Sequence, residues 1–101
     1  MITVIASIKV VPDKVVEFVK IFNENVPNVL TEDGCIEYYP TVDIETGLEV
    51  QQADPSVVTI VECWESVDAL KLHLTAPHML RYRSQTKDLV ESVSIKVLQP
   101  V

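Results

Sequence analysis

The segment from Val57 to Trp64 constrains the fold more than any other part of this 101-residue chain. It reads Val-Val-Thr-Ile-Val-Glu-Cys-Trp, so the strand that it predicts is apolar on both faces apart from Thr59 and Glu62. An antiparallel sheet with one face in water alternates apolar and polar residues instead. Both faces of this strand therefore need cover, and helices packed on one face supply only half of it. We expect the sheet face of a second copy to supply the rest, which gives a symmetric homodimer.

The composition agrees with a sheet-rich domain. Val occurs 18 times and Ile 8 times, whereas Phe, Trp and Tyr together make up 6% of the residues. β-branched side chains favour strands over helices. Because the length is typical of one domain, we expect a single domain over residues 1–101.

The pattern of apolar residues predicts four strands. They cover residues 2–11, 35–44, 56–65 and 92–99, and a polar stretch from about 45 to 55 separates the middle two as a long hairpin loop. In the first strand every even position is apolar, as one buried face requires.

Three helical segments lie between these strands. Asp13 is the expected N-cap of the first, and Pro27 is expected to kink or end this helix near Asn25, with residues 28–32 as a further short turn. Ser66 is the expected cap of the second, and Pro77 stands in the first turn of the third. Apolar stripes at helical spacing mark the faces expected to be buried: Val15, Phe18, Val19, Phe22 and Val26; Val67, Leu70 and Leu74; and Met79, Tyr82, Thr86 and Leu89.

The resulting order β-α-β-β-α-α-β is that of the ferredoxin-like split βαβ arrangement. It is an α+β fold in which helices cover one face of a four-stranded antiparallel sheet.

Charge and cysteine content exclude several classes of function. The net charge is −7, and the only dense basic stretch is Arg81-Tyr82-Arg83, so we expect neither nucleic acid nor an anionic membrane as a partner. No apolar run reaches the roughly 18 residues of a membrane helix, and no basic region precedes the apolar start as in a signal peptide. Cys35 and Cys63 form neither a disulfide framework nor a metal knuckle. Two free thiols in a cytoplasmic protein are the simplest account.

The sequence lacks the familiar motifs of nucleotide, flavin, zinc-protease and serine-hydrolase sites. It does contain two histidines, His73 and His78, five residues apart across a predicted helix break. Either imidazole could act as a general acid or base near neutral pH. Their spacing is not the i, i+4 pair of a helical zinc site, so we expect no metal. The alternative is that both are structural.

Aromatic and acidic residues could complete a pocket. Glu62 and Trp64 share one strand face, and a carboxylate on such an apolar face needs a partner or a wet cavity. Tyr38 and Tyr39 point to opposite faces, so at most one of them faces a cavity under the helices. Tyr82 stands one helical turn after His78. Aromatic walls with a few polar groups suit a planar organic ligand, although such aromatics also serve as plain core.

Four segments carry a resemblance to a known family. Val11-Pro12-Asp13-Lys14, Asp33-Gly34-Cys35-Ile36-Glu37-Tyr38-Tyr39, Val61-Glu62-Cys63-Trp64-Glu65-Ser66 and His73-Leu74-Thr75-Ala76-Pro77-His78 together resemble the antibiotic biosynthesis monooxygenase (ABM) family, in particular its quinol monooxygenase branch. The resemblance spans essentially the whole chain. It implies a dimeric α+β barrel of two ferredoxin-like subunits, with a ligand cavity between the sheet and helices of each.

The resemblance also implies a function, since characterised members oxidise polyphenols or quinols with O₂ and without flavin, haem or metal. On this hypothesis the partners are a small aromatic substrate and O₂, no cofactor is needed, and His73 or His78 is the catalytic base. The substrate-binding residues would be Phe22, Tyr39, Glu62, Trp64 and Tyr82. Two alternatives use the same scaffold: an isomerase of a small phosphorylated sugar, with Arg81 or Lys71 at the phosphate, and a non-catalytic ligand-binding or stress protein. A haem-degrading activity is less favoured, because relatives of that kind use an amide side chain on the first strand, where Ser7 is the nearest polar residue.

Overall fold

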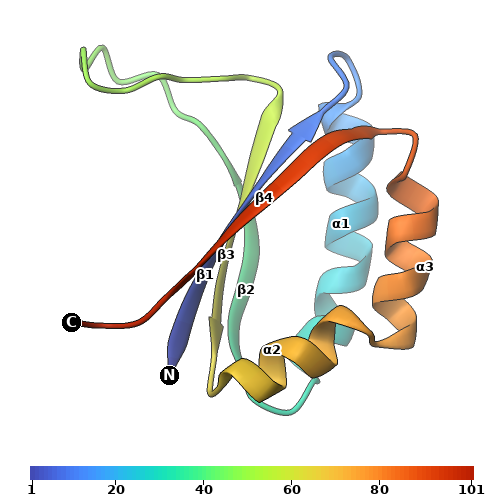
Figure 1. The fold of residues 1–101 in the computed structure, drawn as a ribbon. Helices are drawn as coiled ribbons and strands as arrows, with labels where there is room; N and C mark the ends of the chain where they lie inside the picture. Colours follow the sequence, from blue (N-terminus) through green and yellow to red (C-terminus); the bar gives the residue numbers. More distant parts are fainter.

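The structure, a computed structural model, describes residues 1–101. The elements follow one another as β1 (Ile2–Val10), α1 (Val15–Leu30), β2 (Cys35–Val42), β3 (Val57–Trp64), α2 (Val67–Leu74), α3 (Pro77–Thr86) and β4 (Val90–Leu98). The four strands form one sheet in the order β2-β3-β1-β4 with antiparallel neighbours throughout. All three helices lie on the same side of this sheet (Figure 1). The α+β, ferredoxin-like fold expected from the sequence is thus confirmed.

The alternation of side chains in the central strands separates an inner, helix-covered face from an outer one. Every even residue of β1 from Ile2 to Val10 is buried, and Val58, Ile60, Glu62 and Trp64 are buried on β3. Their odd-numbered neighbours, among them Ile5 and Val61, are only partly buried. They form the outer face of the sheet, which the helices do not cover.

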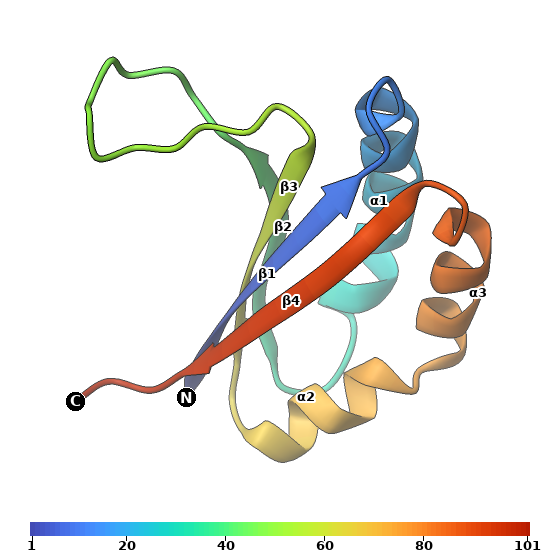
Figure 2. The same ribbon diagram turned by 45° about the horizontal axis from the view of Figure 1, so that its top comes forward.

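The inner face is incompletely covered at one edge. The register pairs Val93, Ile95 and Val97 of β4 with Ile8, Ala6 and Val4, so these side chains point to the helix side. They nevertheless remain 58%, 50% and 45% exposed. These side chains are exposed because β4 forms an edge of the sheet, beyond the helices (Figure 2).

Two expectations about the first helix were wrong. Asp13 is not its N-cap: Lys14 holds that position, and Asp13 has a φ of 74°. Pro12 and Asp13 are the central residues of a turn closed by the bond from the Lys14 N–H to the Val11 carbonyl. A positive φ at the third position of a turn, directly after a proline, is that of a type II turn, and aspartate tolerates it.

Pro27 does not end α1, which continues to Leu30, so the separate turn expected for residues 28–32 is mostly helix. The proline removes a hydrogen bond to the carbonyl of Asn23, which lies on the exposed side where water can take its place. Val29, fully buried two residues later, holds the last turn on the core.

The expected faces of the other helices are correct except at the ends of α2. Ser66 caps α2 by accepting the N–H of Ala69, and Met79, Tyr82, Thr86 and Leu89 are all buried. In α2, however, Leu70 and His73 are buried, whereas the expected Val67 and Leu74 are substantially exposed. A helix of eight residues buries a short stripe, and here that stripe runs through the histidine.

The connection between β2 and β3 is a long loop that extends away from the body of the molecule (Figures 1 and 2). It carries the exposed apolar residues Ile44, Leu48 and Val50. None of the three helices has the length and apolar character needed to cross a membrane.

Gly34 joins α1 to β2 at a close approach to α2. Its φ is 85°, and a Cβ placed on it would lie 2.7 Å from the Cβ of Ala69. Gly47 has a similar φ of 76° but no atom within 4 Å of such a Cβ. A substitution at Gly47 therefore tests only the cost of a left-handed backbone. A substitution at Gly34 tests that cost together with the cost of a steric clash.

We predict that Gly34→Ala destabilises the protein more than Gly47→Ala, by about 1–3 kcal/mol, because only the first change also overpacks a contact. Urea unfolding of the two variants and the wild type measures the difference. Equal losses would show that α2 can move away from Gly34 at no cost.

Candidate active site

A cavity of about 150 Å³ lies between the inner sheet face and the helices. Its lining is mostly apolar, and its polar side chains are Tyr38, Glu62, His73, Tyr82 and Arg83. Val93 and Ile95 of β4, which are both exposed, also line it. We call it the inner cavity. An apolar pocket with a few converging polar groups is the usual form of a site for a small organic ligand.

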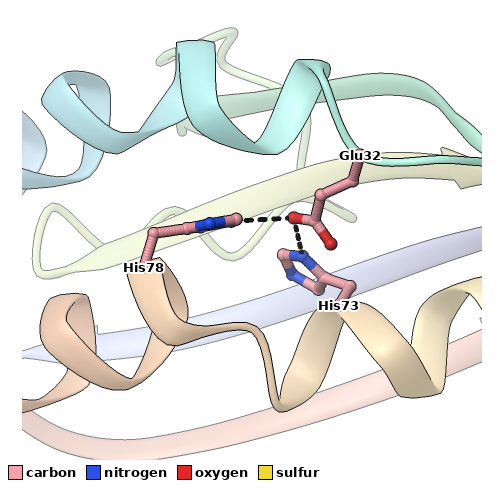
Figure 3. A group of neighbouring side chains, drawn as sticks. All are labelled: Glu32, His73 and His78. Atoms are coloured by element: carbon pink, nitrogen blue, oxygen red, sulfur yellow. Dashed lines mark hydrogen bonds and ion pairs between the residues drawn. The ribbon is translucent and has the colours of Figure 1, made fainter.

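His73 is the buried imidazole of this cavity, with 2% of its surface exposed. It lies in the last turn of α2, where its ring packs at 4.6 Å from Trp64 and edge-on at 5.3 Å from Tyr38, measured between ring centres. Its Nδ1 is 2.8 Å from Oε2 of Glu32, a residue that follows the end of α1 (Figure 3).

The same glutamate oxygen also contacts the second histidine. Nε2 of His78, in the first turn of α3, is 2.9 Å from Glu32 Oε2 (Figure 3). Thr75 and Ala76 end α2, and Pro77 starts α3 in a new direction, so two histidines five residues apart approach one carboxylate from different helices. A continuous helix would have placed them about 140° apart around its axis.

Burial and Glu32 act on the His73 imidazole in opposite directions. Burial disfavours the charged ring and lowers its pKa, whereas the hydrogen bond and the charge of Glu32 raise it; His78 and Arg83 lower it further. The net direction is downward. His73 is therefore neutral at neutral pH and able to accept a proton.

Glu62 titrates in an unusual range. Burial raises the pKa of its carboxyl to about 7, although the hydrogen bond of 2.9 Å from Trp64 Nε1–H to Oε1 lowers it and the charge of Glu32 raises it. The cavity therefore contains a carboxyl that is partly protonated at neutral pH. Such perturbed groups are common at functional sites.

Two phenols complete the polar lining. Burial is the largest cause that raises the pKa values of Tyr38 and Tyr82, so both hydroxyls stay protonated at neutral pH. Phe22 connects them, since its ring stacks on Tyr38 at 5.3 Å and meets Tyr82 edge-on at 5.6 Å. The three rings form an aromatic wall on one side of the inner cavity.

Six of the seven predicted site residues divide into three groups. Phe22, Glu62, His73 and Tyr82 line the inner cavity. Trp64 lies next to it, in contact with His73 and bonded to Glu62. His78 instead lines a separate polar hollow, which is formed by Ile21, Glu24, Asn25, Asn28, His78, Arg81 and Gln85.

Tyr39 was placed in the cavity wrongly. It pairs with Val61 on the outer face and is 46% exposed, and its neighbour Tyr38 takes the inner position. Strand alternation in the sequence allows only one of these two tyrosines to face the cavity. The register of β2 on β3 decides which of them does.

Glu32 is the member of this side-chain cluster that the sequence did not reveal. It lies 41 and 46 positions from the histidines that it contacts, in a turn next to Asp33-Gly34 that reads only as the end of a helix. No local pattern distinguishes it from the other acidic residues of the chain.

Glu32, His73 and His78 are also the residues that could hold a metal ion. Their three ligand atoms lie within 4.8 Å of one another, and two histidines with one glutamate is a ligand set that zinc accepts. The two hydrogen bonds to Glu32 already engage these same atoms without an ion. Of the residues suggested for a phosphate, Arg81 lines the polar hollow rather than the inner cavity, and Lys71 is exposed.

Both cysteines are free. Burial and nearby acidic groups raise the pKa of the Cys35 thiol to about 11, so it is not an activated nucleophile.

Comparison with known proteins places this arrangement in context. The family described as antibiotic biosynthesis monooxygenase matches residues 1–85. A protein named "Probable quinol monooxygenase YgiN" from Escherichia coli K12 is 39% identical over 106 aligned positions, which cover 99% of this chain and 98% of that protein.

Solved structures agree. That of Rv0793 from Mycobacterium tuberculosis matches with a TM-score of 0.80 and 28% identity over 99% of this chain and 94% of that one. A conserved protein from Methanosarcina mazei Go1 has the same fold, with a TM-score of 0.82 at 24% identity over 97% and 90% of the two chains.

The pKa of Glu62 makes stability depend on pH. The pKa of Glu62 is about 7 in the folded state and 4.5 ordinarily. The stability that the protonated carboxyl contributes is therefore complete below about pH 4.5 and is lost as the pH rises through 7. The difference corresponds to roughly 3 kcal/mol. We predict that Glu62→Gln is more stable than the wild type by about 2 kcal/mol at pH 8 and by less than about 1 kcal/mol at pH 5, since the amide keeps an acceptor for Trp64.

Urea unfolding at the two pH values measures this effect. Glu45→Gln, in the exposed loop between β2 and β3, is the matched control and should show no such pH-dependent gain. A gain for Glu62→Gln that is equal at both pH values would contradict the assignment.

Proposed function

Since the chain belongs to the antibiotic biosynthesis monooxygenase family, we propose that it is a cofactor-independent monooxygenase that oxidises a quinol or a related polyphenol with O₂. The observation that carries the proposal is the buried, neutral His73 in an apolar cavity with aromatic walls. The name of the Escherichia coli relative supports the substrate class.

The chemistry needs little from the protein beyond a base and a protected pocket. Removal of a proton from a quinol hydroxyl leaves an electron-rich anion that can itself pass an electron to O₂. For a naphthohydroquinone, the sum of the reaction is substrate plus O₂ giving hydroxynaphthoquinone plus water. The aromatic substrate supplies all four electrons, so one oxygen atom enters the product and the other becomes water.

Each lining residue then has a role. His73 is the base, because it is the histidine that faces the inner cavity. Phe22, with Tyr38 in place of Tyr39, supplies the aromatic wall against which the substrate ring would lie. Tyr82 and Glu62 would orient the substrate hydroxyl, and Trp64 would support His73 from behind. Neutral donors are worth most in such an apolar site, since they strengthen as charge develops on the substrate oxygen.

A homodimer through the outer sheet faces belongs to the same proposal. Ile5 and Val61 lie on the outer face of the central strands, where no helix covers them, and Tyr39 stands exposed beside Val61. Burial of this face by a second copy would remove apolar surface from water on both chains.

Oxygen consumption with a naphthohydroquinone tests the activity. We predict that the wild type consumes O₂ above the spontaneous rate and that one atom from ¹⁸O₂ enters the product. His73→Ala should lower kcat/KM at least about 100-fold, as expected for loss of a general base.

Two controls make this result specific. Arg81→Ala, in the polar hollow, should keep near wild-type activity, and prior treatment with EDTA should leave the rate unchanged because no metal takes part. Product without ¹⁸O, or full activity in His73→Ala, would overturn the proposed function.

Sedimentation velocity tests the dimer. We predict a species of twice the 11.3 kDa chain mass at micromolar concentration. Val61→Glu, which places a charge on the outer face, should give monomers, whereas Val16→Glu, on the exposed side of α1, should remain dimeric. A monomeric wild type would contradict the proposed interface.

A further inference from the structure

The hydrogen bond from His73 to Glu32 determines which ring nitrogen of His73 is the base. A carboxylate has no proton to donate, so Nδ1, 2.8 Å from Glu32 Oε2, carries the hydrogen. In the neutral ring the lone pair then lies on Nε2. That atom has no hydrogen-bond partner within the chain, yet no buried polar side-chain atom is left unpaired. Nε2 therefore keeps an accessible surface, and His73 is a lining residue of the inner cavity.

From this geometry we infer that Glu32 is a positioning residue for the reaction: it fixes the tautomer of His73 and stabilises its protonated form, and His78 acts only by holding Glu32. The inference rests on the proposed function, because it assigns roles around the base of that reaction. It also decides between the two histidines.

The proton step shows why Glu32 matters. When substrate binds, its O–H bond breaks, an N–H bond forms at His73 Nε2, and the electron pair stays on the substrate oxygen. His73 then becomes a cation in a site where burial opposes charge. Glu32, whose Oε2 already accepts the Nδ1–H, supplies the compensating negative charge with no movement. A buried charge without such a partner would be strongly unfavourable.

His78 has a different environment. It lines the polar hollow with Arg81 and Gln85 and is not among the residues of the inner cavity. Its Nε2–H donates to the oxygen that also accepts from His73, so it holds the carboxylate in place from the other side. Its loss removes one of two hydrogen bonds to Glu32 but leaves the bond to His73.

No other charged group can replace Glu32 at Nδ1. Glu62 and Tyr38 face His73 from the sheet, and Tyr82 and Arg83 face it from α3. Glu62 Oε1 is engaged by Trp64 Nε1–H, and the Arg83 guanidinium donates to the carbonyl of Leu74. Glu32 is thus the only carboxylate hydrogen-bonded to the His73 ring. The same carboxylate oxygen also contacts His78.

The test uses Glu32→Gln, Glu32→Asp and His78→Gln in the full-length protein, with kinetics on a naphthohydroquinone and ¹⁵N NMR of the histidine rings. The expected wild-type spectrum has His73 neutral with its proton on Nδ1. In Glu32→Gln the amide can donate to Nδ1 and so favour the other tautomer. We expect kcat to fall about 100-fold or more with KM little changed.

The pH dependence has a defined direction. Because Glu32 raises the pKa of His73, its replacement by Gln should move the titration of His73, and the acidic limb of kcat/KM, to lower pH. A purely structural role would not move this limb. Glu32→Asp should recover part of kcat and the Nδ1–H tautomer, and His78→Gln should lose less than 10-fold, since the glutamine amide can still donate to Glu32.

The outcomes separate the inference from the proposed function. Loss of activity in His73→Ala together with wild-type kcat and tautomer in Glu32→Gln would overturn the inference alone. Wild-type His73 with its proton on Nε2 would also overturn it, even if Glu32→Gln does not fold. Activity that survives His73→Ala overturns the proposed function.

Discussion

The two hydrogen bonds to Glu32 Oε2 connect the three parts of the helical layer. Glu32 follows α1, His73 ends α2, and His78 begins α3, so one carboxylate oxygen fixes the relative positions of the helices that close the inner cavity. A buried imidazole without a partner would cost a few kcal/mol, which a domain of this size cannot easily lose. The position of His73 and the stability of the fold therefore depend on the same contact.

Burial makes this cavity suitable for proton transfer by acting on an acid and a base in opposite directions. It lowers the pKa of the His73 ring and raises that of the Glu62 carboxyl to about 7, so His73 is neutral and Glu62 is partly protonated at neutral pH. The cavity therefore carries less charge than these two residues would carry in water, which favours an apolar aromatic ligand. It also makes any charge that forms on that ligand strongly dependent on the few donors nearby.

The fold could be predicted from the sequence because its elements follow from local periodicity. Alternation in β1, the cap at Ser66, the proline at the start of α3, and the apolar stripe with Phe18 and Phe22 each act over a few residues. The errors arose where distant packing overrides local preference. Pro27 stays helical because Val29 is held in the core, and Asp13 serves a turn rather than a cap.

The candidate site was harder to predict for the same reason. Glu62 and Trp64 could be placed on one face because strand alternation is local, and the two histidines could be singled out as a pair across a helix break. The choice between Tyr38 and Tyr39 depends on the register of β2, and Glu32 depends on where α1 ends relative to α2. Neither is encoded within a short window. A scaffold shared by proteins with different reactions supplies a sheet, a helical layer and a space between them, and it does not by itself determine the chemistry. In the proposed function that determination lies in Glu32, a turn residue that would hold the His73 ring so that its Nε2 is free to accept a proton.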